Sequence, residues 1–545
     1  MAAAPALASV TLDGVTGRVD PGQTLFDWAE ARGLTVPTSC LKQGKCRECL
    51  VEIESGAESL SAPAPQEAHL DGRFRLACRT RVTGDGPVRA HTLRRGSLRI
   101  ETSAAAYLDA GIVLDPAVTV DGGHVLLDGE PIAESVGPLH GLAIDLGTTT
   151  VAVRLHDLAN GRLLATRSFE NPQRFGGTNV MSRIHYDGEH RGRLLQRTLL
   201  GYLSHAIESL PADPQTIYEI VVAGNPTMRD LLFGLDVQGL GVLPYRSGTE
   251  AALAEGRVAT TSLSTTARRL RLPVHPSARV FGLPLVGSHV GADAAACLLA
   301  TRMAESDGLA ALLDIGTNTE AFFGNRERML AASCPAGPAF EGGGVGAGMP
   351  ALDGAVERVR LRNDGHCEIE TVGGAPACGI CGSGLVDLLS EMLRTGRMNA
   401  QGRFADLDQP LALDPEGRVV VTEFDVNELA QAKGANAAGL RALADTWGAD
   451  LGRLDTLYLA GGFASHIDVD AACRIGLIPD LPRERIVKVG NAALAGASIA
   501  LLSKQRRADL EVQVRRVELV RLEAHPGFFD FFVQGCQFEP FGVSP

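Results

Sequence analysis

A group of cysteines near the start of the chain has the spacing of a metal-binding site. Cys40, Cys46 and Cys49 lie in the stretch SCLKQGKCRECLVEI, and Cys78 follows in RFRLACRT. The odd number of neighbouring thiols argues against a disulfide, because a disulfide uses cysteines in pairs. Four thiolates are the ligand set of a 2Fe–2S cluster, and the spacing C-x5-C-x2-C differs by one residue from the C-x4-C-x2-C pattern of such sites. These residues are therefore predicted to hold a 2Fe–2S cluster.

Zinc is the rival occupant of the same cysteines, since structural zinc sites also use four thiolates. A zinc ribbon normally brings two C-x2-C pairs together, whereas Cys78 has no second cysteine near it in the sequence. The spacing therefore favours the cluster over zinc.

Two Asp-x-Gly-Thr stretches far apart in the chain form a second group of candidate residues. In GLAIDLGTTT, an apolar run ends in Asp145, and in LAALLDIGTNTE the same arrangement ends in Asp314. A tight turn that contains glycine offers backbone N–H groups and hydroxyls to phosphate, and a carboxylate at a strand end can hold the water shell of a metal ion. The repeat predicts a duplicated fold whose halves bind one nucleotide. The residues that follow the two aspartates are Gly147, Thr148, Thr149, Thr150, Gly316, Thr317, Asn318 and Thr319.

A pair of glycines is the third feature of this region. The apolar stretch LDTLYLAGGF runs into Gly461 and Gly462, where the missing side chains let a base or a ribose approach the backbone. A Rossmann interpretation fails, because no G-x-G-x-x-G follows a strand with an acidic residue suitably placed. The glycine pair therefore supports a nucleotide site of another kind.

The elements around the cysteines are short and end at clear turn signals. Asp13-Gly14 predicts a hairpin between two strands, and a helix is expected from Leu25 towards Gly33, followed by the cysteine loop and another strand. This order, with a distant fourth ligand, resembles the β-grasp ferredoxins over about residues 8–92, and the five-residue first gap is similar to the adrenodoxin-like branch.

Composition limits the classes of function. A chain of 545 residues suggests roughly three or four domains, and the net charge of −13 argues against nucleic acid or an anionic membrane as a partner. No apolar run approaches the roughly 20 residues that span a bilayer, and the N-terminus lacks the basic region of a signal peptide. Eleven cysteines are too sparse for a disulfide scaffold, so a cytoplasmic protein is expected. The expected domains are residues 1–92, a connecting segment at 93–139 with a hairpin in DGGHVLLDGEP, and residues 140–545.

The ordered set of Asp145, Asp314 and Gly461-Gly462 resembles the two phosphate motifs and the adenosine motif of the actin, hexokinase and heat-shock chaperone (ASKHA) ATPases, over about residues 140–545. The resemblance implies a duplicated ribonuclease-H-like domain of two lobes. It also implies that the two aspartates position Mg²⁺ and the attacking water, that the glycines and hydroxyls after them hold the phosphates of ATP, and that the glycine pair admits the adenosine.

A β-grasp ferredoxin placed ahead of such an ATPase resembles the reductive activators of corrinoid-dependent methyltransferase systems. The stretches AGNPTM (223–228), AGPAFEG (336–342) and ICGSGLVD (380–387) also resemble segments of that family. The resemblance implies an oxidoreductase coupled to ATP hydrolysis, which passes one electron from the cluster to a corrinoid protein and converts Co(II) to Co(I). Its expected partners are that corrinoid protein and a low-potential electron donor, and a homodimer is expected.

Two alternative functions remain at this point. One is activation of another low-potential acceptor, such as a radical dehydratase, although those activators lack a β-grasp domain. The other is a kinase or a chaperone-like module of the ASKHA type with a regulatory cluster. In addition, Cys378 and Cys381 form a C-x-x-C pair, for which a structural role or a place in the nucleotide pocket is favoured over thiol redox chemistry.

Overall fold

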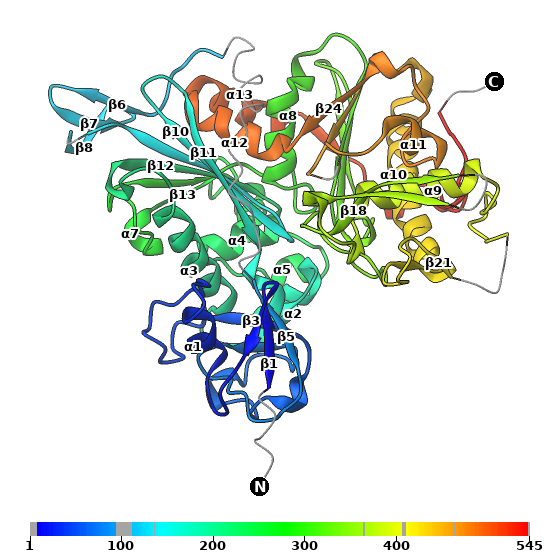
Figure 1. Cartoon of the computed structure of the whole chain (residues 1–545). Coiled ribbons are helices and arrows are strands. Elements are labelled where there is room, and N and C mark those ends of the chain that lie inside the picture. Colours follow the sequence, from blue (N-terminus) through cyan, green and yellow to red (C-terminus); the bar gives the residue numbers. More distant parts are fainter. Residues whose placement is uncertain are drawn as a thin grey trace, which may run out of the picture. The chain divides into compact units, whose positions relative to one another are not determined.

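The structure is a computed structural model that describes residues 8–93, 112–135, 137–362, 366–405, 410–462 and 464–542. The chain divides into two compact units, in which unit 1 comprises residues 1–283 with 500–505, and unit 2 comprises residues 284–499 with 506–545. The elements of both units are labelled in Figure 1.

Unit 1 begins with a five-stranded sheet of order β2-β1-β5-β3-β4, in which β1 and β5 run parallel. Asp13 and Gly14 both have positive φ and form the predicted turn between the first two strands. Leu25 and Trp28 of α1 are fully buried against this sheet. The β-grasp ferredoxin predicted for this part of the chain is thereby confirmed. Its elements are β1 (Ser9–Leu12), β2 (Val15–Arg18), α1 (Leu25–Glu30), β3 (Leu50–Ser55), β4 (Phe74–Leu76) and β5 (Val88–Thr92).

A small three-stranded sheet, β6-β7-β8, lies in the segment expected to connect the two large parts of the chain. The hairpin predicted in DGGHVLLDGEP is confirmed, because β7 and β8 pair in antiparallel fashion around Asp128 and Gly129. The strands are β6 (Val118–Asp121), β7 (His124–Leu127) and β8 (Glu130–Glu134).

The rest of unit 1 is built on a six-stranded sheet of order β11-β10-β9-β12-β14-β13. The strands β9, β10 and β11 are antiparallel neighbours, whereas β12 and β14 continue the sheet parallel to β9. The strands are β9 (His140–Leu146), β10 (Thr150–Asp157), β11 (Leu163–Glu170), β12 (Ile217–Gly224), β13 (Leu263–Thr266) and β14 (Arg279–Gly282). The helices are α2 (Val180–Glu189), α3 (Leu194–Glu208), α4 (Pro226–Phe233), α5 (Gln238–Gly241), α6 (Gly248–Ala254) and α7 (Ala267–Leu270).

Unit 2 has a sheet of order β24-β23-β15-β16-β17-β25, in which the five strands β17-β16-β15-β23-β24 repeat the order β11-β10-β9-β12-β14 of unit 1. The sixth strands differ, because β13 lies beside β14 in unit 1, whereas β25 lies beside β17 in unit 2. Here β15, β16 and β17 are antiparallel neighbours, and β23 and β24 continue parallel to β15. Two sheets with this shared order are what a duplicated ribonuclease-H-like fold requires, so the predicted fold class is confirmed. The strands are β15 (Ala310–Ile315), β16 (Thr319–Gly324), β17 (Met329–Cys334), β23 (Thr456–Ala460), β24 (Ile486–Gly490) and β25 (Val517–Leu519).

The long helix α10 (Glu423–Trp447) covers β16 and β17 of this sheet. It starts at a capping box, in which Thr422 and Asp425 exchange side-chain and backbone hydrogen bonds, and it ends at Gly448 with a φ of 81°. These signals fix the register of its buried face. The other helices of this region are α8 (Ala292–Thr301), α9 (Gly382–Arg394), α11 (Val469–Arg474), α12 (Ala492–Leu502), α13 (Lys504–Val514) and α14 (Phe528–Gly535), and the short strands are β18 (Ala355–Leu361), β19 (Cys367–Thr371), β20 (Gly379–Ile380), β21 (Leu411–Ala412) and β22 (Val420–Val421).

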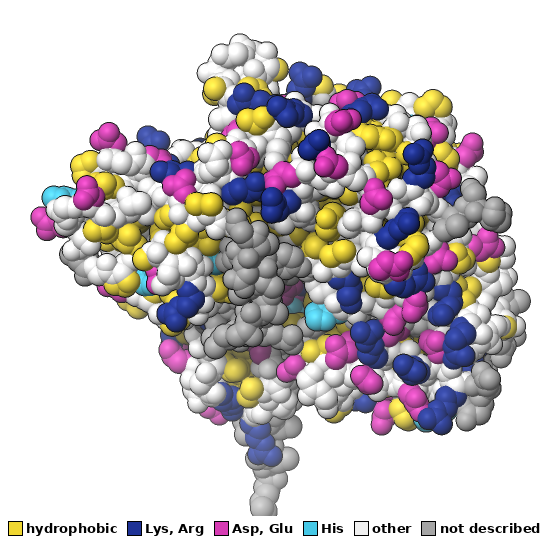
Figure 2. Space-filling view, turned by 90° about the horizontal axis from the view of Figure 1, so that it is seen from above, with side chains coloured by type: hydrophobic (Ala, Val, Ile, Leu, Met, Phe, Trp, Pro, Cys, Tyr) yellow, Lys and Arg dark blue, Asp and Glu magenta, His cyan; other side chains and the backbone are white. Residues whose placement is uncertain are grey.

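Charged side chains of both signs are interspersed on the surface. On the face drawn in Figure 2, the basic and acidic side chains of the described residues alternate rather than gathering into a field of one sign. In the described part of the chain, no helix is long and apolar enough to cross a membrane.

Candidate cluster and nucleotide sites

The predicted cluster cysteines come together as two pairs. The sulfur atoms of Cys49 and Cys78 lie 3.4 Å apart and are buried, and the half-buried thiols of Cys40 and Cys46 interact with each other. Within the described residues, no three histidine, cysteine or acidic side chains converge on a single metal position. A 2Fe–2S cluster takes two cysteines on each iron, so the arrangement in two pairs fits such a cluster.

One thiol of each pair is biased towards the thiolate, which is the form that binds metal. Burial raises the pKa of Cys40, but backbone N–H groups of Cys46, Lys45 and Gln43 outweigh it and bring the pKa to about 7. The hydrogen bond with Cys78, followed by burial, raises the pKa of Cys49, and the same hydrogen bond lowers the pKa of Cys78. The four cysteine sulfur atoms are therefore suited to hold a metal group that is bound by thiolates.

The loop that carries Cys40, Cys46 and Cys49 curls tightly. Leu41, Lys42, Gly44 and Arg47 all have positive φ values. A Cβ on Gly44 would lie 2.6 Å from Nε of Arg79, so a larger residue would displace that side chain. The positive φ of Gly44, 72°, also favours glycine at this point.

The first phosphate motif forms a tight turn between β9 and β10. The N–H of Gly147 donates to the carbonyl of Thr150 over 3.0 Å, and a Cβ on Gly147 would lie 2.7 Å from that same oxygen. The hydroxyl of Thr148 accepts a hydrogen bond from the amide of Asn225 at the start of α4. Asp145 is half-buried near the end of β9. The glycine therefore shapes the turn, and the hydroxyls and remaining N–H groups are its possible phosphate ligands.

The second phosphate motif and the adenosine motif are neighbours in unit 2. Asp314 on β15 pairs with Ala460 on β23, and the next residue, Gly461, begins the glycine pair. A Cβ on Gly461 would lie 2.4 Å from the carbonyl oxygen of Ile315 and 3.3 Å from Oδ1 of Asp314. Only glycine permits this close approach. The two motifs, which are far apart in the sequence, therefore lie side by side at one edge of the sheet.

The hydroxyls after Asp314 differ in their surroundings. Thr317 donates to Oε2 of Glu341 over 2.5 Å. Thr319 is fully buried and its hydroxyl has no hydrogen-bond partner among the described residues. The two threonines are thus in different environments, and contact with phosphate remains a prediction for both.

Sequence reasoning missed the acidic neighbours of Asp314. Glu320 lies directly opposite Asp314 in the antiparallel pair of β15 and β16 and is buried. Burial, then the charges of Asp293 and Asp314, raises the pKa of Glu320 well above its usual range. Burial also raises the pKa of Asp314, whose Oδ2 accepts from the thiol of Cys297 at 3.3 Å. The strand register, which places Glu320 six residues after Asp314 on the facing strand, was the signal available.

The predicted nucleotide residues are divided between the units. Asp145 and the residues up to Thr150 belong to unit 1, whereas Asp314 to Thr319 and the glycine pair belong to unit 2.

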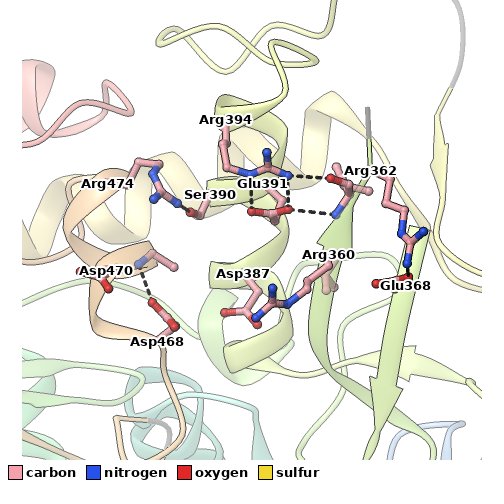
Figure 3. Close-up of a pocket in the computed structure, with 13 residues that line it drawn as sticks. Arg360, Arg362, Glu368, Asp387, Ser390, Glu391, Arg394, Asp468, Asp470 and Arg474 are labelled. Carbon is pink, nitrogen blue, oxygen red and sulfur yellow. Dashed lines mark hydrogen bonds and ion pairs between the residues drawn. The ribbon is translucent and has the colours of Figure 1, made fainter. Parts of the chain in front are cut away.

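A separate cavity of about 840 Å³ lies between β18, α9 and α11 in unit 2 (Figure 3). Two ion pairs lie in its lining, Arg394 with Glu391 and Arg362 with Glu368, and Arg474 donates to the hydroxyl of Ser390. None of the predicted cluster or nucleotide residues lines it. The cavity is therefore distinct from the predicted sites.

The fold and the two sites together define a class of protein, in which a 2Fe–2S ferredoxin domain precedes a duplicated ASKHA domain. Known family models match this chain as the 2Fe–2S iron-sulfur cluster binding domain at residues 10–83, the RACo middle region at 140–306 and the C-terminal ASKHA domain of RACo at 309–544. The chain belongs to the RACo family. The family predicted from the motifs is thereby confirmed.

Individual relatives extend over most of the chain. The chain is 28% identical over 579 residues to the corrinoid activation enzyme RamQ of Eubacterium limosum, covering 93% of this chain and 94% of the relative. It is 26% identical over 405 residues to the Co(II) methylated amine-specific corrinoid protein reductase of Methanosarcina barkeri, covering 68% and 72%. A solved structure of a reductive activator for corrinoid, iron-sulfur protein is similar with a TM-score of 0.71 and 26% identity over 98% of both chains.

Proposed function

We propose that this protein uses ATP to drive the one-electron reduction of Co(II) to Co(I) in a corrinoid protein of a methyltransferase system. The observation that supports the proposal best is the joining of a 2Fe–2S domain and an ASKHA domain in one chain that is similar over 98% of its length to a reductive activator for corrinoid, iron-sulfur protein. When bound, the cluster supplies a single electron at low potential. A separate low-potential donor and a homodimeric assembly are parts of the same proposal.

We assign Cys40, Cys46, Cys49 and Cys78 as the cluster ligands. Their arrangement in two pairs, each with one thiol biased towards the thiolate, supports this assignment. The left-handed turns of the loop aim backbone N–H groups at the sulfur atoms, as the contact from Lys45 N to the sulfur of Cys40 at 3.4 Å illustrates. Such contacts stabilise the reduced, more negative state of a cluster.

We assign the nucleotide to the two Asp-x-Gly-Thr turns and the glycine pair. Asp145 and Asp314 are the proposed residues that position Mg²⁺ and the attacking water, because each carboxylate lies where a strand meets a tight turn. The turns supply phosphate ligands, and the open backbone at Gly462 leaves room for the adenosine. Burial and the charges of Asp293 and Asp314 raise the pKa of Glu320, and a cation bound here would offset the repulsion among these carboxylates.

ATP is needed because the electron moves to a lower potential. Each 59 mV of a one-electron deficit costs about 1.4 kcal/mol, so a gap of roughly 300 mV requires on the order of 7 kcal/mol. Binding and hydrolysis of a nucleotide by a hinged, two-lobed domain are a known means of coupling such energy to a change of state.

The test uses two variants that separate the electron donor from the energy source. Cys46→Ser is expected to lose the EPR signal of the reduced cluster and transfer no electron, yet to retain ATP hydrolysis. Asp314→Asn is expected to bind nucleotide and accept an electron into the cluster, yet to lose hydrolysis and fail to reduce the corrinoid protein. Anaerobic absorption spectroscopy of the Co(II) band follows the transfer.

Matched variants control for indirect effects. Cys378→Ser removes an exposed thiol, and Asp307→Asn removes an exposed carboxylate that pairs with Arg326 in unit 2. Both are expected to behave as the wild type does. Full reduction of Co(II) at the same rate without ATP would contradict the proposal. Phosphorylation of a small molecule, or ATP hydrolysis stimulated by peptides but not by Co(II) corrinoid protein, would favour the kinase or chaperone-like alternative.

A further inference from the structure

One short segment of unit 1, residues 171–183, contacts both the first phosphate motif and the ferredoxin domain. This bridge segment contains the 3-10 turn η4 (Pro172–Gly176) and the first turn of α2. It follows directly from β11, whose last residue, Glu170, pairs with Thr150 at the phosphate turn. Figure 1 shows α2 and α3 next to the ferredoxin strands β3 and β5.

Two fully buried side chains attach the bridge segment to the phosphate turn. Asn171, which caps η4, donates from its amide to the carbonyl of Gly147 over 2.8 Å, and its backbone N–H donates to the carbonyl of Thr149 over 2.7 Å. The guanidinium of Arg183 donates to the carbonyl of Thr148 over 2.7 Å. Successive carbonyl groups of the turn are thus all held by this one segment.

Arg183 is a buried cation without a carboxylate. Its other partners are the carbonyl of Gly177 at 3.0 Å, the sulfur of Met228 at 3.0 Å and the amide oxygen of Gln173 at 3.5 Å. Among the described residues, no acidic side chain forms an ion pair with it, and burial lowers its pKa to about 9. A buried charge without a counter-charge is costly, so an anion bound at the turn would stabilise this position.

The opposite side of the bridge segment holds the ferredoxin domain. Arg174, on η4, forms ion pairs with Glu170 and, at 3.4 Å, with Glu52 on β3. The rings of Phe175 and His69 pack in a T-shaped arrangement with centroids 6.0 Å apart. Slightly further along α2, the hydroxyl of Tyr186 donates to the carbonyl of the same His69 over 2.8 Å.

A second contact fixes the cysteine loop itself. Glu48, between two cluster cysteines, accepts from Ser39 at 2.5 Å and pairs with Nε2 of His205 on α3 at 3.0 Å. A Cβ on Gly201 would lie 2.8 Å from Cγ of Glu48, so α3 is shaped to receive this side chain. Helix α3 also packs on η4, so the contact between Glu48 and α3 is connected to the bridge segment as well.

We propose that the bridge segment couples the docked position of the ferredoxin domain to occupancy of the first phosphate motif. A nucleoside triphosphate at Gly147–Thr150 fixes the carbonyl groups that Asn171 and Arg183 hold and supplies the missing counter-charge. The ordered segment then presents Arg174 and Phe175 to the ferredoxin domain. This inference rests on the proposed nucleotide site and adds the route by which that site acts on the cluster domain. Arg174 is a positioning residue in this scheme.

Coupling of this kind is reciprocal, because a ligand that favours docking is itself bound more tightly when docking is possible. The test uses the full chain with its cluster reconstituted, and AMP-PNP with Mg²⁺ as the probe. In the wild type, AMP-PNP is expected to slow hydrogen exchange of the amides of β3 and of residues 66–70. In Arg174→Gln, AMP-PNP is expected to bind about 5-fold or more weakly by calorimetry and to leave exchange in the ferredoxin domain unchanged.

Arg89→Gln is the matched control, because it removes an exposed ion pair with Glu54 on the same ferredoxin sheet, outside the bridge contacts. Arg89→Gln should bind AMP-PNP as tightly as the wild type does and should show the same slowing of hydrogen exchange in the ferredoxin domain. If Arg174→Gln does not fold, Tyr186→Phe, which removes one hydroxyl, is expected to show the same loss of response. Binding of AMP-PNP with no change of exchange in the wild-type ferredoxin domain, or with an unchanged response in both variants, would overturn the coupling and leave the nucleotide site intact. Failure of AMP-PNP to bind the wild type would overturn the nucleotide site and the coupling together.

Discussion

The glycine pair after β23 offers a test in which neighbouring positions should respond differently to the same substitution. Gly461 has a φ of 100°, and an added Cβ would lie 2.4 Å from the carbonyl oxygen of Ile315. Ordinary contacts between heavy atoms lie at about 3.5–4.0 Å, so the strand end would have to move by roughly 1 Å. An added Cβ at Gly462 meets no atom within 4 Å.

Gly461→Ala is expected to destabilise unit 2 even without nucleotide. A side chain in this region of φ costs of order 1–3 kcal/mol, to which the contact with Ile315 adds. Each kcal/mol lowers the melting temperature by roughly 2–4 °C for a domain of this size. Differential scanning calorimetry of the nucleotide-free protein measures the effect.

Gly462→Ala is expected to leave the nucleotide-free melting temperature unchanged and to reduce its rise with ATP and Mg²⁺. A ligand at 100 times its Kd stabilises the folded state by about 2.7 kcal/mol, and a 100-fold loss of affinity leaves about 0.4 kcal/mol. The reason is that the new methyl group occupies the space proposed for the adenosine. A full rise of the melting temperature in Gly462→Ala would refute the assignment of the adenosine site, whatever the outcome at Gly461.

Two further predictions concern buried and exposed side chains of unit 2. Burial lowers the pKa of Lys433, which donates to the carbonyls of Gly535 and Gln537, to about 7. Because its pKa in the unfolded chain is about 10.4, the unfolded state binds more protons between these pH values, and wild-type stability should rise from pH 7 to pH 10 relative to Lys433→Met. A parallel pH dependence of the two melting temperatures would count against this. Cys378 is exposed, whereas Cys381 is buried and donates to the carbonyl of Val356 at 3.4 Å, so of these two thiols iodoacetamide should label Cys378 alone in the native protein. Equal labelling of both thiols, seen by peptide mass spectrometry, would contradict the structure.

Much of the fold was predictable because the local signals agree with the tertiary structure. Asp13-Gly14 is a typical hairpin turn sequence, and the apolar runs before Asp145 and Asp314 are short and end at a glycine turn, as strands do. The duplication followed from finding the same turn twice. The order of five strands that the two large sheets share shows that the repeated signal reflected a repeated topology.

The residues that support the sites were not predictable in the same way, because their partners are distant in sequence. In the sequence, Arg183 is not distinguished from other arginines on helices. Only the structure shows that its guanidinium donates a hydrogen bond to the carbonyl of Thr148. Glu48 lies between two of the cysteines proposed as cluster ligands, and its partner His205 is 157 residues away. The position of Glu320 could have been predicted more easily, because the turn between two antiparallel strands determines which residue faces Asp314.

The return of residues 500–505 to unit 1 has a consequence for how the protein folds during synthesis. The N–H of Asp115 donates to the carbonyl of Leu502, and the N–H of Lys504 donates to the carbonyl of Asp115. The side chain of Leu501 lies over Gly141 on β9. The ribosome adds about 5–20 residues per second, so residues 500–505 are synthesised roughly 10–45 s after Leu283. During this interval the first unit has an open apolar surface over β9. Nascent chains stalled before residue 500 should therefore bind chaperones that recognise exposed apolar surface, and they should release them once the segment has emerged.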